Sequence, residues 1–222
     1  MTSRARHHQY QRALHGDMHR TRTRTVHPTV AHRQRGSTSH RSATFSAPET
    51  WHEPRGQDEP RGLAQIRYVR ESAGEGYIHP VTIDEVRQRI SQLPQQFVQP
   101  IDVIQFSSMT RKRSLFPLYG MQWGPNVYLY PIEASLQETY HRPPTPQQLI
   151  EAKMYGGVWT QERRFWTLSW TAESIRAFYL HNVLVHEIGH VNDQRNTNSA
   201  ARERYANWFA TEYGYRSWTG RI

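Results

Sequence analysis

The chain has no cysteine among its 222 residues. Disulfide frameworks and cysteine-based zinc sites are therefore excluded, and any bound metal must use His, Asp or Glu. Long apolar runs are also missing, because the most apolar stretch, residues 177–191, is short and carries a glutamate and three histidines. A standard secretion signal and a membrane span are thus not expected, and we predict a cytoplasmic protein without membrane contact.

Acidic residues are scarce at the N-terminus. Residues 1–50 contain nine arginines but only Asp17 and Glu49 as acids, so +7 of the formal net charge of +9 lies there. Residues 1–62 cannot bury enough apolar surface to offset the entropy of ordering, which predicts a disordered, basic, Arg/His/Ser-rich tail. Three roles stay open for it: a solvated segment, a tether that binds nucleic acid or an acidic partner through counterion release, or an organelle transit peptide. A second basic stretch, "MTRKRS" at 109–114, is predicted to be a solvated loop.

Periodic elements begin at about residue 63 and predict one domain over 63–222. Caps, turn residues and hydrophobic spacing mark where each element starts and stops. In chain order we expect a helix from cap Thr82 to Pro94, a strand over 101–107, a hairpin of "LYGMQWG" and "NVYLYPIE" turning at 124–126, a helix over 146–155 capped by Thr145, a strand in "RRFWTLSW", a helix from cap Thr171 to Asp193, and a helix from cap Ser199 to near Gly214. Such an order is typical of an α+β fold with a small mixed sheet.

The segment "HNVLVHEIGHVND", residues 181–193, has the pattern of a metal site on a helix. At about 100° per residue, His186, His190 and Asp193 share one stripe. Imidazoles at i and i+4 can bind one ion from a single helix, and Glu187 beside them suits a general base. Gly189 leaves room for another backbone to pass close by. The opposite, core-facing side carries Ala177, Leu180, Leu184, Ile188 and Val191.

A catalytic zinc usually has three protein ligands, so a third ligand is needed. The last helix offers Glu203, with Asn207 one turn later on the same side. Asp193 is the alternative third ligand, although three ligands from under two turns of one helix make poor tetrahedral geometry. We expect Glu203 to ligate, and Asn207 and Asp193 to support the ligands from outside the coordination sphere. A metzincin pattern is excluded, because it would require Gly at 193 and His at 196, where Asp193 and Asn196 stand.

The combination of "HEIGH" with the downstream "ERYANWFA" resembles the gluzincin arrangement, HExxH followed by a glutamate. In particular it is similar to the compact ImmA/IrrE-like bacterial zincin domains. The segments "MQWGPNVYLYPIE" and "NVLVHEIGHVNDQRNTN" also resemble a group of uncharacterised bacterial proteins.

The resemblance implies a zincin-like fold and a zinc-dependent metallopeptidase that acts on a peptide or protein. It implies His186, His190 and Glu203 as Zn²⁺ ligands and Glu187 as the catalytic base. An extended substrate would pair with an edge strand, for which "NVYLYPIE" and "RRFWTLSW" are the candidates. The alternative is a catalytically inactive, zincin-like metal-binding or interaction module whose basic tail binds nucleic acid or an acidic partner.

Overall fold

The computed structural model describes residues 49–53, 56, 62–114 and 118–220. The chain divides into two compact units, residues 1–51 and 52–222. The predicted tail over 1–62 lies almost wholly outside the described residues. Within that range, His52 stacks its ring 6.2 Å from the ring of Tyr128 and places Nε2 2.6 Å from Oε1 of Gln105. This residue therefore packs on the sheet of the second unit.

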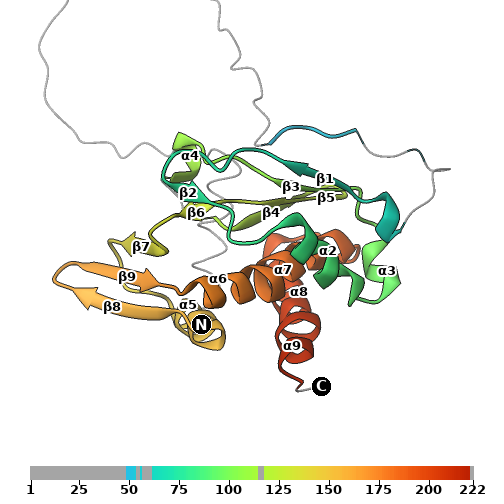
Figure 1. The fold of residues 1–222 in the computed structure, drawn as a ribbon. Coiled ribbons are helices and arrows are strands. Elements are labelled where there is room, and N and C mark those ends of the chain that lie inside the picture. The colour runs from blue at the N-terminus through green and yellow to red at the C-terminus, as the bar shows by residue number, and fades with distance from the viewer. Residues whose placement is uncertain (1–48, 54–55, 57–61, 115–117, 221–222) are drawn as a thin grey trace, which may run out of the picture. The chain divides into compact units, whose positions relative to one another are not determined.

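The main sheet of the second unit has the strand order β1-β3-β5-β4. Its first three strands are parallel, and β4 pairs antiparallel with β5 as the predicted hairpin. Consequently β4 is an edge strand. Figure 1 shows α2 and α7 beneath one face of this sheet, where Ile104, Phe106, Val127 and Leu129 are buried. The strands are β1 (Arg67–Arg70), β3 (Val103–Phe106), β4 (Gly120–Trp123) and β5 (Asn126–Leu129).

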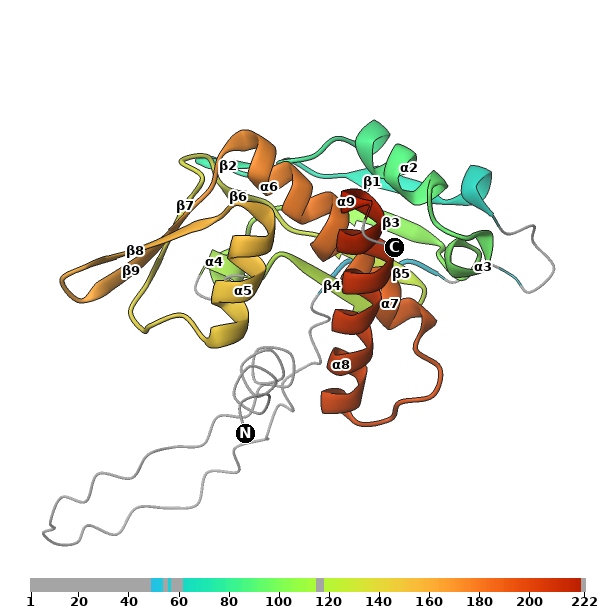
Figure 2. The ribbon, with the colours of Figure 1, turned by 90° about the horizontal axis from the view of Figure 1, so that it is seen from below.

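A second, three-stranded sheet has the order β7-β9-β8 and is antiparallel throughout. Its hairpin of β8 and β9 extends away from the helices (Figure 2). The strands are β7 (Gln137–Tyr140), β8 (Val158–Glu162) and β9 (Phe165–Ser169). The remaining short elements are η1 (Leu63–Gln65), β2 (Tyr77–Ile78) paired with β6 (Ile132–Glu133), α3 (Gln95–Val98) and α4 (Arg111–Ser114).

The predicted helix starts are confirmed where a capping box marks them. In α2 (Ile83–Ser91) the Thr82 side chain accepts from the Glu85 backbone, and the Glu85 side chain returns a bond to Thr82. The same arrangement opens α5 (Pro146–Tyr155) at Thr145. Each box satisfies backbone N–H groups that a first helical turn leaves unpaired.

The long predicted helix is continuous but not uniform. From the cap Thr171 it runs as α6 (Ala172–Phe178), a π-helical segment η2 (Tyr179–Val183) and α7 (Leu184–Asn192). The predicted core face holds for Leu184 and Ile188, which are fully buried, whereas Ala177, Leu180 and Val191 are only partly buried. For Ala177 and Leu180 the reason is the π segment, which inserts a residue into a turn and rotates the part of the helix before it against the part after it.

The last helix differs from its prediction at both ends. It runs as α8 (Ser199–Phe209), the π segment η3 (Ala210–Arg216) and α9 (Ser217–Thr219). Asn198 caps it instead of Ser199, because the Asn198 side chain accepts from the Ala201 backbone. It does not close at Gly214, since that glycine sits mid-helix where a side chain would collide with the His181 carbonyl.

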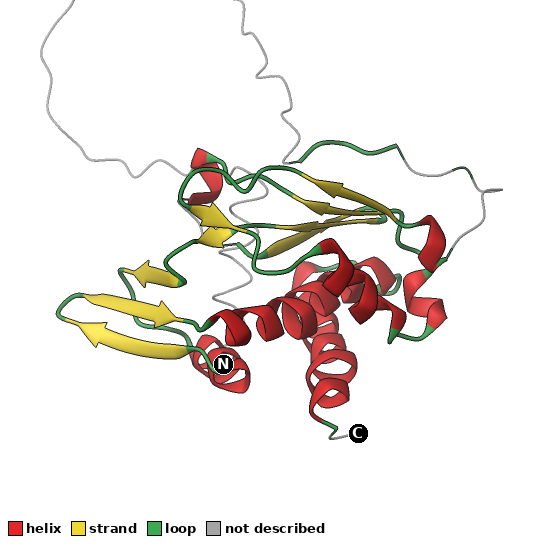
Figure 3. Cartoon of the chain, viewed as in Figure 1, coloured by secondary structure: helices red, strands yellow, loops and turns green. Residues whose placement is uncertain are grey.

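Helices and strands together make a mixed α+β fold, as predicted (Figure 3). Within the described ranges, none of the helices has the length and apolarity needed to cross a membrane.

Candidate metal centre

The structure brings His186 and His190 of α7 together with Glu203 of α8. The two histidine Nε2 atoms are 3.1 Å apart. Glu203 places Oε2 3.5 Å from Nε2 of His186 and Oε1 3.3 Å from Nε2 of His190. Zinc binds nitrogen and oxygen at about 2.0–2.2 Å, so tetrahedral ligand atoms lie about 3.3–3.5 Å from one another. The two histidine nitrogens thus have nearly the spacing of two corners of a zinc tetrahedron, and each has one oxygen of the Glu203 carboxylate beside it. With one ligand atom taken from each residue, the three atoms lie within 4.8 Å of one another.

The group is sheltered yet reachable. The exposed side-chain fractions are 20% for His186, 11% for His190 and 33% for Glu203. Within the described part of the chain this is the one cluster of three His, Asp or Glu side chains whose ligand atoms all lie within 4.8 Å of one another.

Close packing of α7 on α8 makes this cluster. A Cβ atom on Gly189 would lie 3.0 Å from Cβ of Phe209 and 3.1 Å from Cα of Ala206. The expected role of Gly189 is therefore confirmed: its missing side chain lets the two helices approach and brings Glu203 to the histidines.

Asp193 belongs to the turn between the helices and not to the cluster. It is 6% exposed, and its Oδ1 accepts hydrogen bonds from the backbone N–H groups of Arg195 and Asn196 at 3.3 and 3.2 Å. The Asn196 side chain donates to the same oxygen at 2.9 Å. These bonds shape the reversal of the chain after α7. Glu203, and not the alternative Asp193, lies beside the two histidines.

The charges of the cluster compensate one another. Burial alone would raise the pKa of Glu203, but its hydrogen bonds with His186 and His190 outweigh burial and hold the pKa well below its usual range. Burial lowers the pKa of His190. For His186 burial acts in the same direction, but the bond to Glu203 and the nearby carboxylates raise its pKa overall. A deprotonated carboxylate is thus held beside two imidazoles, which is the donor set of a His₂Glu metal site.

Glu187 lies beside the cluster, at the edge strand β4. It is 7% exposed, and burial raises its pKa to about 7. A Cβ atom built on Gly120 would lie 3.0 Å from both Cγ and Oε1 of Glu187. The carboxylate is therefore enclosed between α7 and β4, with a pKa close to the value at which a group can both accept and return a proton near neutrality.

The supporting role predicted for Asn207 is not visible. Its backbone carbonyl accepts from Oγ1 of Thr211 at 2.9 Å, and no bond joins its side chain to the three cluster residues in the described structure. Nδ1 of His190 is buried and has no hydrogen-bond partner there either. The role of Asn207 stays a prediction.

Arg202 is a neighbour of the site that the sequence did not reveal. Its Nη2 donates to Oε1 of Gln122 on β4 at 3.0 Å, and its guanidinium lies 3.4 Å from the carbonyl oxygens of His190 and Asp193. Arg202 thereby ties the edge strand to the end of α7. Its partner Gln122 is 80 residues away in the chain, so no local pattern indicates the contact.

The two strands predicted to bind an extended peptide are not edges. The last two residues of "NVYLYPIE" form the short β6, which is paired with β2. The main strand of "NVYLYPIE" is β5, which lies between β3 and β4, and that of "RRFWTLSW" is β9, which lies between β7 and β8. Their backbone groups are used on both sides by neighbouring strands. The edge strand beside the cluster is β4.

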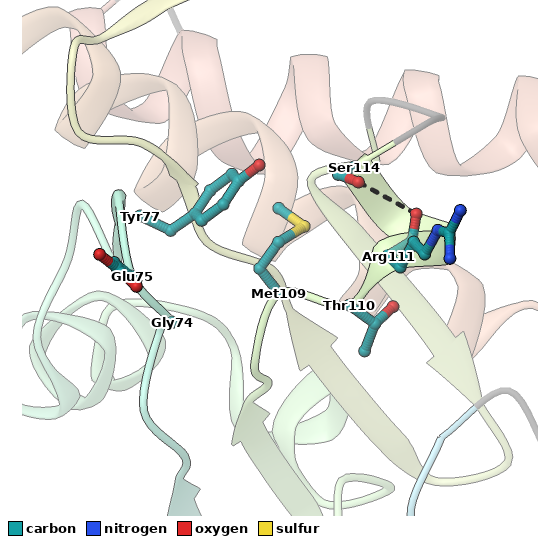
Figure 4. A pocket seen from close by; sticks show the side chains of 7 residues that line it. All are labelled: Gly74, Glu75, Tyr77, Met109, Thr110, Arg111 and Ser114. Atoms are coloured by element: carbon teal, nitrogen blue, oxygen red, sulfur yellow. Dashed lines mark hydrogen bonds between the residues drawn. The ribbon is translucent and has the colours of Figure 1, made fainter.

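A separate pocket of about 210 Å³ lies beyond the carboxyl end of β3, beside β2 and α4 (Figure 4). It takes in part of residues 109–114, for which the prediction of a solvated loop was wrong. Arg111–Ser114 form the short helix α4, and Arg113 packs its guanidinium 4.4 Å from the centre of the Tyr130 ring. The cluster residues do not line this pocket, and we assign no chemistry to it. Its lining is Gly74, Glu75, Tyr77, Met109, Thr110, Arg111 and Ser114.

Comparisons with models of known protein families, with curated proteins and with solved structures found no match.

Proposed function

We propose that the protein is a zinc-dependent hydrolase of the zincin type, with peptide bonds as its substrate. Zinc would be held by His186, His190 and Glu203, and Glu187 would be the general base. The observation that carries the proposal is the approach of the three donor side chains: the two histidine Nε2 atoms are 3.1 Å apart, and each has an oxygen of Glu203 at 3.3 or 3.5 Å. That spacing fits zinc, and three protein ligands leave a fourth position open, as in catalytic sites.

The bound zinc would supply Lewis acidity for a carbonyl and a lower pKa for a water. Glu187 would accept a proton from the water while the oxygen of the water attacks the carbonyl carbon. It would then donate the proton to the amide nitrogen as the carbon–nitrogen bond breaks.

The edge strand β4 supports an extended substrate. Among the described strands it pairs only with β5, and its first residue, Gly120, touches Glu187. A peptide that adds to this edge would have its backbone fixed by main-chain hydrogen bonds next to the base.

Two variants test the proposal on purified protein. The His186→Ala variant should lose the stoichiometric zinc that metal analysis finds in the wild-type protein. Glu187→Gln should keep the zinc but cleave a mixed peptide library at least about 10²-fold more slowly, the usual range for a lost general base. Glu162→Gln makes the same chemical change on the exposed strand β8 and should behave as wild type.

Equal cleavage by wild type and Glu187→Gln would refute the assigned base. Substoichiometric zinc that is unchanged in His186→Ala would refute the metal site. Stoichiometric zinc without cleavage of any peptide would favour the metal-binding module instead.

A further inference from the structure

The edge strand β4 meets the metal-site helix at a single glycine. The three atoms nearest to a Cβ built on Gly120 are Cγ and Oε1 of Glu187 and Cγ1 of Val183, each at 3.0 Å. Val183 and Glu187 are four residues apart, so they present one face of the helix to β4. No atom of His186, His190 or Glu203 is among these three neighbours.

Backbone conformation does not account for a glycine here. Gly120 lies in a regular strand and is not one of the glycines with a positive φ. Any residue could adopt its backbone angles, so the close approach to the helix is the feature that requires the missing side chain.

A side chain at this position would displace Glu187 sooner than Val183. Val183 is 6% exposed and belongs to the main core, and its β-branched side chain has one strongly preferred rotamer in a helix. The Glu187 side chain is longer and unbranched, so it has more torsions through which its Cγ and carboxylate can move.

The strand is also held where it is, so it cannot move aside. Before Gly120, the Tyr119 hydroxyl donates to Oε2 of Glu138 on β7 at 2.5 Å, and Tyr140 donates to the same oxygen at 2.7 Å. After Gly120, Gln122 accepts from Arg202 at 3.0 Å. These bonds anchor β4 on both sides of the glycine, to the second sheet and to α8.

We infer that Gly120 is a positioning residue for Glu187: the absent side chain at 120 leaves the space in which the carboxylate is held beside the three metal-site side chains. This inference rests on the proposed function, which gives Glu187 its task. It adds a requirement from the main sheet: the position of the Glu187 carboxylate depends on the edge strand β4 as well as on α7.

The test uses Gly120→Ala and Gly120→Val in the full chain. Both should bind one zinc per chain with unchanged affinity. Crystal structures should show the Glu187 carboxylate displaced, further in the valine variant. For peptide cleavage, kcat should fall about 10²-fold for valine, since a misplacement of about 1 Å can cost that much. The fall should be smaller for alanine, about 10-fold, because its Cβ requires a shift of only a few tenths of an ångström, and KM should stay within about 3-fold for both variants.

Gly124→Ala is the matched control. Gly124 has a φ of 60° and no atom within 4 Å of an added Cβ, so this variant loses stability through backbone strain without touching Glu187. It should keep the position of Glu187 and the wild-type kcat.

A Glu187 carboxylate that stays in place in the Gly120→Val crystal structure would overturn the inference, whatever the activity. If the valine variant does not fold, the position of Glu187 in Gly120→Ala decides. If wild type binds zinc but cleaves no peptide, the proposed function fails, and the displacement in the crystal structures still tests the positioning by itself.

Discussion

We predict that the protein loses stability in acid through protonation of one side chain, the imidazole of His181. It lies in the π segment η2, where its imidazole stacks on Trp218 with centroids 4.9 Å apart and an interplanar angle of 13°. Its Nδ1 is buried and has no hydrogen-bond partner in the described structure. Burial, with a further contribution from the charge of Arg89, lowers the pKa of His181 from 6.5 to about 4.

The sign of the effect follows from proton linkage. As the pH falls from 6.5 to 4, the unfolded chain binds a proton at this ring that the folded chain does not, so acid favours unfolding. The stability that the neutral ring contributes is present above pH 6.5 and is lost towards pH 4. A difference of 6.5 − 4 = 2.5 in pKa corresponds to about 3.4 kcal/mol. Because the ring is partly exposed, solvent screening reduces this to about 1–2 kcal/mol.

Urea unfolding at pH 7.5 and pH 4.5, with chelator present, measures the effect. His181→Phe keeps a ring against Trp218 but cannot bind a proton, so it should lose about 1–2 kcal/mol less stability than wild type over this interval. His141→Phe makes the same substitution at an exposed histidine and should follow wild type. The reasoning is refuted if wild type and His181→Phe lose the same free energy of unfolding between the two pH values.

Two further predictions concern packing and metal. Gly189→Ala places a methyl group 3.0 Å from Phe209, so it should lower the free energy of unfolding by about 1–3 kcal/mol in urea titration and weaken zinc binding as α8 moves away. An unchanged zinc affinity would contradict this account of helix packing. Zinc at 100 times its dissociation constant should raise the free energy of unfolding by about 2.7 kcal/mol, and Glu203→Gln should remove most of that gain; equal stabilisation of both proteins would exclude Glu203 as a ligand.

The parts of the fold that depend on neighbouring residues could be predicted from the sequence. Thr82, Thr145 and Thr171 each bond to the residue three positions later, so the cap and its partner appear together in the chain. The turn at 124–126 and the histidine pair are equally local. The side of the last helix on which Glu203 lies could also be predicted, because regular helix geometry determines which residues share a side.

Contacts between distant strands could not be predicted in this way. The order β1-β3-β5-β4 places β5 inside the sheet and β4 at its edge, although both have strand-like sequences. Strand pairing depends on which segments meet in three dimensions, and the same hydrophobic pattern suits an inner or an edge strand. The edge strands were wrongly predicted, and the contact of Gln122 with Arg202 was missed, because both depend on contacts between segments far apart in the sequence.

The π segment η2 explains how one helix can contribute both to the core and to the candidate metal site. At about 100° per residue, an unbroken helix would place Ile175 and Tyr179 within about 20° of His186, on the side that faces the candidate metal site. Both are in fact buried in the core, at 1% exposure each. The residue that η2 adds to a turn rotates the two parts against each other, so Leu184 and Ile188 take over the core side while the histidines turn towards α8.

The same segment also has its backbone satisfied by the neighbouring elements. The His181 carbonyl accepts from the Tyr155 hydroxyl at 3.1 Å, and Gly214 of the second π segment leaves the space in front of that carbonyl. Buried backbone groups are nearly always paired, so these contacts compensate for the irregular backbone bonds of the π segment. The π segment is therefore supported by α5 and the last helix. A uniform helical period read from the sequence does not include this segment, so it located the histidines but misassigned the core residues before them.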